Sequence, residues 1–155
     1  MKPTPFSVRR SLCLSLASLC IASPTLAEGP GKDEAVKMIE KAVAMHKASG
    51  KDKTLAAVNQ KDGPFHKGEL YVFAYDTSGA IVAHPVNAKL LGKNLLEVPD
   101  TDGKFYRKTI QELAATKGSG WVDYKYKNPV TGRNEAKTTY IQKVGDVIYA
   151  CGVYL

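Results

Sequence analysis

The fold is decided by residues 70–84, LYVFAYDTSGAIVAH. Residues 70–75 are aromatic and β-branched, residues 76–79 have the composition of a turn, and residues 80–84 are apolar again. Two such runs joined by a short turn that contains glycine predict a β-hairpin. Pro85 ends the second strand, because a proline has no N–H to donate to the neighbouring strand.

Three further strands are predicted nearer the C-terminus. They cover residues 121–126, 135–143 and 147–154. The first two are joined by NPVTG, and the last two are joined by a Gly-Asp turn. Strands that follow one another through short turns pair as antiparallel neighbours, so these segments and the first hairpin predict one antiparallel sheet.

Apolar residues recur every three or four positions in residues 33–49, which is the spacing of one face of a helix. Two acids open this segment and Gly50 follows it, as is typical at the two ends of a helix. Two other helices are predicted over residues 53–59 and 104–116, the second after a long loop over residues 85–103. Helices packed on an antiparallel sheet define an α+β domain.

The N-terminal residues 1–27 have the three parts of a secretory signal peptide. Three basic residues lie in the first ten, a mostly apolar run follows over residues 11–22, and Ser-Pro-Thr-Leu-Ala stands before Glu28. The apolar run is shorter than the roughly 20 residues that span a bilayer. We therefore expect cleavage after Ala27, a periplasmic location, and a mature single domain over residues 28–155 without a transmembrane segment.

The mature chain has 19 basic and 15 acidic residues, which are interspersed along the sequence. Proteins that bind nucleic acid concentrate their basic residues on one face or helix, so the charge pattern argues against a nucleic-acid partner. Of the three cysteines, only Cys151 remains after cleavage, and it lies in an apolar run. We expect no disulfide and a buried, inert thiol.

The sequence lacks the motifs that are typical of catalytic and metal sites. An enzyme needs a nucleophile, a base or a metal at suitable spacing. The three histidines, His46, His66 and His84, are not spaced as metal ligands, and no His-x-x-x-His, Cys-x-x-Cys or Gly-x-Ser-x-Gly motif occurs. The expectation is a protein that is not an enzyme and that needs no metal or cofactor.

A series of short motifs runs in order through residues 33–155. They are Asp76-x-x-Gly79, His84-Pro85, Gly92-Lys93-Asn94, Asp102-Gly103, Gly120-Trp121-Val122-x-Tyr124, Asn128-Pro129, Lys137-x-x-Tyr140 and Gly152-Val153-Tyr154. In this order and near this spacing they resemble single Cache domains of the second type. The resemblance implies a PAS-like fold, with a five-stranded antiparallel sheet, a long N-terminal helix on one face and a ligand pocket on the other. It also implies that the loop and helix over residues 84–108 cover the pocket.

Members of this family are extracytoplasmic sensors of small organic molecules, often carboxylates, and they are commonly parts of chemoreceptors and histidine kinases. In such receptors two membrane helices hold the domain. This sequence instead ends at Leu155, at the end of the last predicted strand. The expectation is a stand-alone periplasmic form for sensing or capture, whose output passes to a membrane-bound signalling protein.

A pocket for a carboxylate needs apolar walls and either a cation or several hydrogen-bond donors. Lys137 is the first candidate cation, because lysine is usually avoided inside a strand and this one matches the family's Lys-x-x-Tyr motif. Arg107 is the other candidate, although either side chain could instead face solvent. His84 could donate to the ligand or hold the long loop through the backbone. The full predicted ligand-binding set is Tyr75, His84, Tyr106, Arg107, Trp121, Tyr124, Tyr126 and Lys137.

Two alternatives stay open from the sequence alone. The aromatic residues of the set could be ordinary core, and a slip of one residue in strand register would exchange the two faces of a strand. The protein could also be a ligand-free interaction module that docks on a membrane histidine kinase, chemoreceptor or transporter. A pocket filled by the protein's own aromatic side chains would favour that module.

Overall fold

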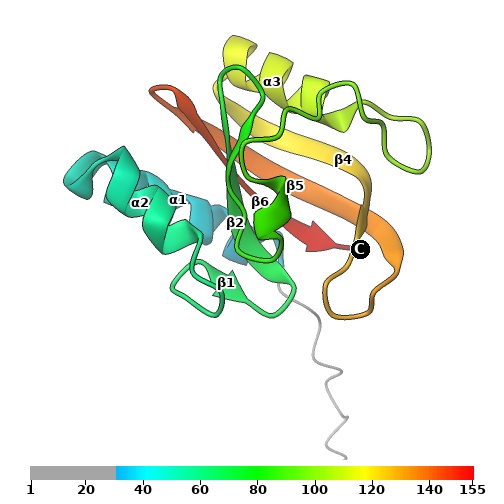
Figure 1. Ribbon diagram of the computed structural model, residues 1–155, viewed down its shortest axis with the longest axis horizontal. Helices are drawn as coiled ribbons and strands as arrows, with labels where there is room; N and C mark the ends of the chain where they lie inside the picture. Colours follow the sequence, from blue (N-terminus) through cyan, green and yellow to red (C-terminus); the bar gives the residue numbers. More distant parts are fainter. Residues whose placement is uncertain (1–30) are drawn as a thin grey trace, which may run out of the picture.

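An antiparallel sheet lies at the centre of the computed structural model, which describes residues 31–155 (Figure 1). The predicted signal peptide, residues 1–27, lies outside the described residues. The strands run in the order β1-β2-β6-β5-β4, and β3 also pairs with β2. The α+β class is confirmed, with the five predicted strands present and a two-residue β1 as a sixth. The strands are β1 (His66–Lys67), β2 (Leu70–Asp76), β3 (Ile81–Ala83), β4 (Ser119–Lys127), β5 (Asn134–Val144) and β6 (Val147–Tyr154).

The turn between β2 and β3 is closed by side-chain and backbone features of the sequence. Asp76 Oδ1 accepts hydrogen bonds from the backbone N–H groups of Ser78 and Ala80, each at 2.9 Å. Gly79 has a φ of +91°, a conformation that favours glycine, and an added Cβ would lie 2.7 Å from the Leu96 side chain. This turn therefore requires glycine and brings the loop after β3 against the hairpin.

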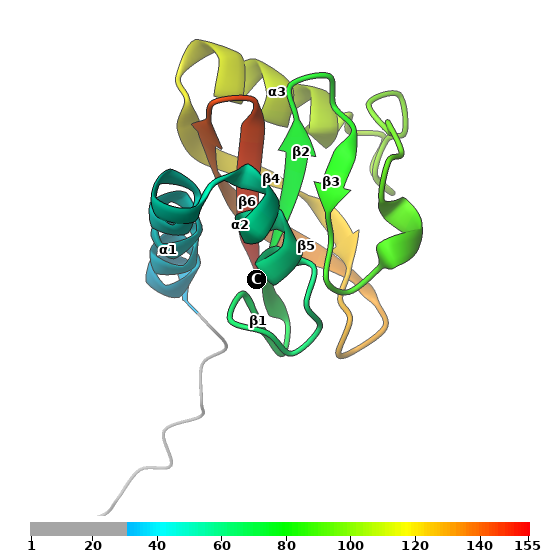
Figure 2. The same cartoon turned by 60° about the vertical axis from the view of Figure 1, so that its left-hand side comes forward.

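Helices cover both faces of the sheet. Figure 1 shows α1 (Lys32–Ser49) and α2 (Lys51–Val58) on one side and α3 (Tyr106–Thr116) on the other. The third helix begins two residues later than predicted, and a 3-10 turn, η1 (Ala88–Leu90), divides the long loop before it. Figure 2 shows β3 beside β2 and, next to β3, the loop that carries η1 and leads to α3.

The alternation of side chains along the strands divides the core into two clusters. The cluster under α1 contains Ile39 together with Tyr149 and Cys151 of β6. The cluster under α3 contains Tyr71 of β2 and Ile110 of the helix. Burial raises the pKa of the Cys151 thiol to about 12, which fits the inert role expected for it.

The helices present polar outer faces. On α1 the exposed positions include Lys37, Glu40 and Lys47. Across residues 31–155, no helix is both long enough and apolar enough to cross a bilayer. In the same part of the chain, no three His, Cys, Asp or Glu side chains gather as a metal site would require.

Candidate functional site

A cavity of about 480 Å³ opens on the α3 side of the sheet, and we call it the outer pocket. Its walls come from the loop after β3, the first turn of α3, and the β4–β5 turn with the adjoining strand ends, and Tyr71 of β2 adds to them. It is lined by Tyr71, His84, Val86, Asn87, Val98, Pro99, Asp100, Thr101, Tyr106, Arg107, Lys125, Tyr126, Lys127, Asn128, Pro129 and Asn134.

A much smaller space of about 10 Å³, the inner chamber, lies among aromatic side chains next to the outer pocket. A space of this size holds about one water molecule. The inner chamber is lined by Tyr71, Phe73, Tyr75, Ile81, His84, Leu90, Tyr106, Arg107, Tyr124 and Tyr126. Five residues line both spaces, so the two form one site that is open outside and nearly filled inside: Tyr71, His84, Tyr106, Arg107 and Tyr126.

Lys137, on β5, places its ammonium group among these aromatic side chains. The residue is 1% exposed, and its Nζ lies 4.2 Å from the ring centroid of Tyr71 and 4.5 Å from that of Tyr154. Nζ donates hydrogen bonds to the two tyrosine hydroxyls, at 3.1 and 3.3 Å. Among residues 31–155 no carboxylate forms an ion pair with it. Burial lowers the pKa of Lys137 to about 7, against smaller raising influences from Cys151 and Glu69.

Arg107, in the first turn of α3, brings a second cation to the site. The residue is 6% exposed, and its guanidinium lies 4.4 Å from the ring centroid of Tyr106. Nη1 donates a hydrogen bond to the backbone carbonyl of Val98 at 3.1 Å, whereas the buried Nε has no hydrogen-bond partner within the described chain. A buried donor without a partner is costly, so Arg107 is suited to an acceptor that a ligand would supply.

His84 has two roles in the structure. Its Nδ1 accepts a hydrogen bond from the backbone N–H of Asn87 at 3.1 Å, which holds the start of the long loop. Burial, together with the charges of Lys137 and Arg107, lowers the pKa of His84 to about 4, so the ring is neutral at pH 7. Because Nδ1 is an acceptor, Nε2 carries the proton and is a hydrogen-bond donor at the site.

Stacked tyrosines form the wall of the site between α3 and β4. The rings of Tyr106 and Tyr124 are parallel, with centroids 3.9 Å apart and planes 4° apart. The ring of Tyr126 lies edge-on to both, and the hydroxyl of Tyr124 shares a hydrogen bond of 2.9 Å with Thr139 Oγ1. Burial raises the pKa of the Tyr124 hydroxyl well above its usual value, so this wall is neutral.

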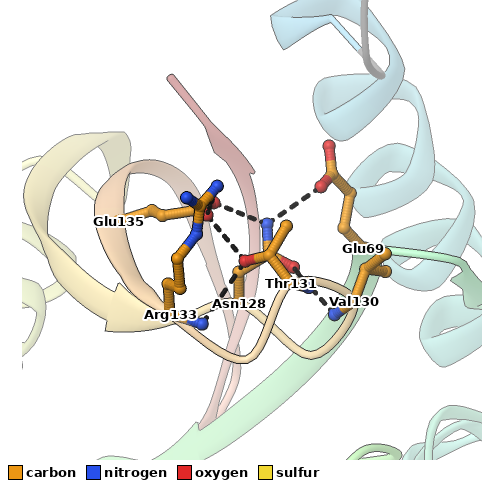
Figure 3. Close-up of polar contacts among 6 residues, drawn as sticks. All are labelled: Glu69, Asn128, Val130, Thr131, Arg133 and Glu135. Carbon is orange, nitrogen blue, oxygen red and sulfur yellow. Dashed lines mark hydrogen bonds and ion pairs between the residues drawn. The ribbon is translucent and has the colours of Figure 1, made fainter.

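The turn between β4 and β5, which also lines the outer pocket, is organised by Asn128 (Figure 3). The residue is 1% exposed, and its Nδ2 donates hydrogen bonds to Glu69 at 3.0 Å and to Glu135 at 2.8 Å. Its Oδ1 accepts a hydrogen bond from the backbone N–H of Val130 at 2.9 Å. Asn128 therefore ties this turn to the segment that precedes β2.

Asp100 is the one acidic residue that lines the outer pocket within the described chain. Its Oδ1 accepts hydrogen bonds from the backbone N–H groups of Asp102 and Lys104, at 2.9 and 2.8 Å. Its Oδ2 accepts one from the backbone N–H of Lys125 at 2.9 Å. Both oxygens are used to fix the loop against β4, so Asp100 is poorly placed to neutralise Lys137 or Arg107.

Six of the eight predicted site residues line the two spaces: Tyr75, His84, Tyr106, Arg107, Tyr124 and Tyr126. Lys137 lines neither space but lies next to this wall, with its ammonium 5.6 Å from the ring centroid of Tyr126. Trp121 requires a correction. Side chains alternate along β4, so Trp121 faces the side opposite to Tyr124. There its ring lies 5.3 Å from that of Tyr140 and 5.3 Å from the ammonium of Lys32 on α1.

Several residues of the site were not in the predicted set, among them Tyr71, Tyr154 and Asn128. Tyr71 lines both spaces and accepts a hydrogen bond from Lys137. The alternation of β2 puts Tyr71 on the same face as Tyr75, so the sequence carried a signal for it. Tyr154 and Asn128 had no such signal beyond their membership of motifs, since their roles depend on neighbours that are distant in sequence.

Three solved structures share the fold. A periplasmic sensor domain of a chemotaxis protein superposes with a TM-score of 0.65 at 21% identity, covering 79% of this chain and 89% of that one. A methyl-accepting chemotaxis protein from Vibrio parahaemolyticus gives a TM-score of 0.68 at 22% identity, with 79% and 87% covered. A Cache chemosensory domain, studied for its recognition of carboxylic acids, gives 0.63 at 23% identity, with the same coverage. The predicted PAS-like fold is confirmed.

Sequence comparison points to the same family. The methyl-accepting chemotaxis protein McpP of Pseudomonas putida is 32% identical over 87 residues, which are 55% of this chain. The aligned part is only 16% of the length of that receptor. A family model described as a Cache domain matches residues 33–154, nearly the whole of the described structure. The chain therefore belongs to the Cache domain family.

Proposed function

We propose that this protein binds a small organic carboxylate in the outer pocket and inner chamber, for sensing or capture and without catalysing a reaction. The observation that carries the proposal is the pair of buried cations, Lys137 and Arg107, which have no acidic partner within the described chain. Burying a charge without a partner is expensive unless a ligand supplies the opposite charge. A carboxylate at this place would accept hydrogen bonds from the free Nε of Arg107 and from Nε2 of His84.

The charges around the pocket also support selectivity against amines. The carboxylate of Asp100 accepts three backbone hydrogen bonds, so it offers little to a ligand ammonium group. A zwitterionic amino acid would leave its ammonium group unpaired beside two cations. We therefore propose a simple acid as ligand, in keeping with the carboxylic acid recognition described for one structural relative.

Binding without catalysis is the proposed role because the polar groups of the site are suited to holding an anion. His84, the natural candidate for a general base, has a pKa of about 4 and would be a weak base at neutral pH. The tyrosine hydroxyls have pKa values above the usual one, which makes them donors and not nucleophiles.

We also propose that the protein works outside the cytoplasm, in the periplasm, after removal of residues 1–27. Cache domains are extracytoplasmic sensor domains, and the first 27 residues have the composition of a signal peptide. A membrane-bound signalling protein is the proposed partner. Mass spectrometry of the protein recovered from the periplasm would test this: a mature chain beginning at Glu28 is the expected result, and an intact Met1 in the cytoplasm would contradict it.

The ligand-free docking module remains the second candidate, because the inner chamber is nearly filled by the protein's own side chains. The outer pocket argues for ligand binding, since its volume of about 480 Å³ is within the range of small-molecule sites. A docking module would have no need of a buried arginine that lines a cavity, or of a buried lysine behind the cavity's aromatic walls.

A thermal-shift screen of the purified protein tests the proposal. The panel contains monocarboxylates of two to six carbons, each with its neutral amide as a control of the same shape, and also dicarboxylates, amino acids, amines and sugars. An acid at 100 times its dissociation constant should add about 2.7 kcal/mol, a shift of a few degrees for a domain of this size. Acids that stabilise while their amides do not are the expected result. Equal shifts for acids and amides, or none at all, would overturn it.

A further inference from the structure

Lys137 reaches its hydrogen-bond partner Tyr71 across an intervening strand. Strand β6 lies between β5, which carries Lys137, and β2, which carries Tyr71. Neighbouring strands are about 4.8 Å apart, so the two side chains together bridge roughly twice that distance over the surface of β6. A side chain on the pocket face of β6 between these two residues would overlap with them.

Gly152 is the residue of β6 at that position. It pairs with Thr139 across the β5–β6 ladder, and Lys137 pairs with Tyr154, the next residue of β6 on the same face. A Cβ added at Gly152 would lie 2.4 Å from Cε and 3.1 Å from Cγ of Lys137. It would also lie 2.3 Å from Oγ1 of Thr139. The stem of the lysine therefore lies directly over the glycine.

The backbone conformation at position 152 does not require a glycine. Gly152 is absent from the positions of positive φ in the described chain, so its conformation is open to other residues. Its neighbours on the same face of β6, Ala150 and Tyr154, both carry side chains. What distinguishes Gly152 is the space above it, which Lys137 fills.

We propose that Gly152 is the positioning residue of the anion site, because the missing side chain lets Lys137 place its ammonium group beside Tyr71. This inference rests on the proposed function. Gly152 acts through Lys137 and does not touch the ligand. A side chain at this position would force the lysine stem away from β6 and move the charge off the aromatic cluster.

The test compares the wild-type protein with Gly152→Ala. The first readout needs no ligand: the ¹³Cε chemical shift of Lys137 is followed by NMR from pH 5 to 11. The rings of Tyr71, Phe73, Tyr126 and Tyr154 surround this amine, its charge acts on His84, and Cys151 and Glu69 are the groups that raise its pKa. Lys137 should titrate near neutrality in the wild type and at least one pH unit higher in Gly152→Ala, because the displaced amine regains water.

The second readout is the affinity for the two- to six-carbon monocarboxylates. Gly152→Ala should weaken every acid that binds the wild type by about tenfold or more. The double variant Thr139→Ala/Gly152→Ala is the control, because it removes the other contact of the added Cβ and keeps the overlap with Lys137. Lys137 should titrate in it as it does in Gly152→Ala. If no acid binds the wild type, the proposed function fails, whereas the titration still decides the role of Gly152.

An unchanged Lys137 titration in Gly152→Ala would overturn the proposal, as would unchanged acid affinity when the wild type binds. If Gly152→Ala does not fold, the double variant Lys137→Ala/Gly152→Ala decides the matter. Recovery of a cooperative urea transition in the double variant supports the proposal, since the overlapping stem has been removed. If the double variant also fails to fold, the overlap with Thr139 explains the loss, and the proposal is overturned.

Discussion

Replacing Lys137 by methionine removes the buried charge and keeps most of the length and apolar volume of the side chain. The structure places Nζ among four aromatic rings, with two neutral hydroxyls as its hydrogen-bond partners. We expect Lys137→Met to abolish selective binding of acids over amides. We also expect the empty protein to become more stable, because the variant no longer buries an unpaired cation.

The size of this gain follows from the pKa of Lys137. The pKa falls from 10.5 to about 7 on folding, and each unit corresponds to about 1.4 kcal/mol. The charged lysine therefore costs the folded state about 5 kcal/mol at pH 6, where it is protonated both folded and unfolded. Between pH 7 and 10.5 the unfolded chain binds more protons, so the wild type gains stability as the pH rises. By pH 9 the cost should have fallen to about 2 kcal/mol.

Urea unfolding of both proteins at pH 6 and pH 9 measures this cost. The stability difference between Lys137→Met and the wild type should shrink by about 3 kcal/mol from the lower to the higher pH. Titrating groups that Lys137 does not influence are common to both proteins and cancel in the difference, and His84, whose pKa lies near 4, is almost fully neutral in the folded wild type at both pH values. The lost hydrogen bonds to Tyr71 and Tyr154 should reduce the gain by a constant amount at both pH values. A difference independent of pH would refute the buried, uncompensated cation on which the argument rests.

Three further outcomes are expected. Acid binding should take up a proton at pH 8, because free Lys137 is mostly neutral there. The affinity should therefore fall as the pH rises above 7, and identical apparent enthalpies of binding in HEPES and Tris buffers would contradict this. Asn128→Ala should cost about 2 kcal/mol in urea unfolding, because Glu69 loses a buried donor, whereas the exposed control Asn134→Ala should stay within about 0.5 kcal/mol. Trp121→Ala should leave acid affinity unchanged, since Trp121 lies on the α1 side of the sheet; a clear loss would return it to the site.

Local patterns were sufficient to predict the strands and helices, because alternation and helical spacing record which face of each element is buried. The two-residue β1 escaped prediction, since so short a strand has no period to detect. Trp121 was placed with Tyr124 through a shared motif, although residues three apart on a strand point to opposite faces. Alternation alone would have separated them.

The arrangement around Lys137 could not be predicted in the same way. Its contact with Tyr71 depends on the order β2-β6-β5, which joins segments more than 60 residues apart in the sequence. The space over Gly152 depends on the same order. The sequence showed a lysine inside a strand, which is an unusual place for a charge. The residues that contact this lysine can be identified only once the order of the strands in the sheet is known.

Strand β6 contributes residues to both core clusters. Its residues Tyr149 and Cys151 pack under α1, whereas Ala150 and Gly152 face the pocket side, so one backbone separates the two compartments. Close-packed interiors transmit small displacements and do not absorb them. A ligand that draws Lys137 and β6 toward the pocket would therefore shift part of the surface on which α1 rests, and pocket occupancy and helix position would be mechanically linked through the sheet.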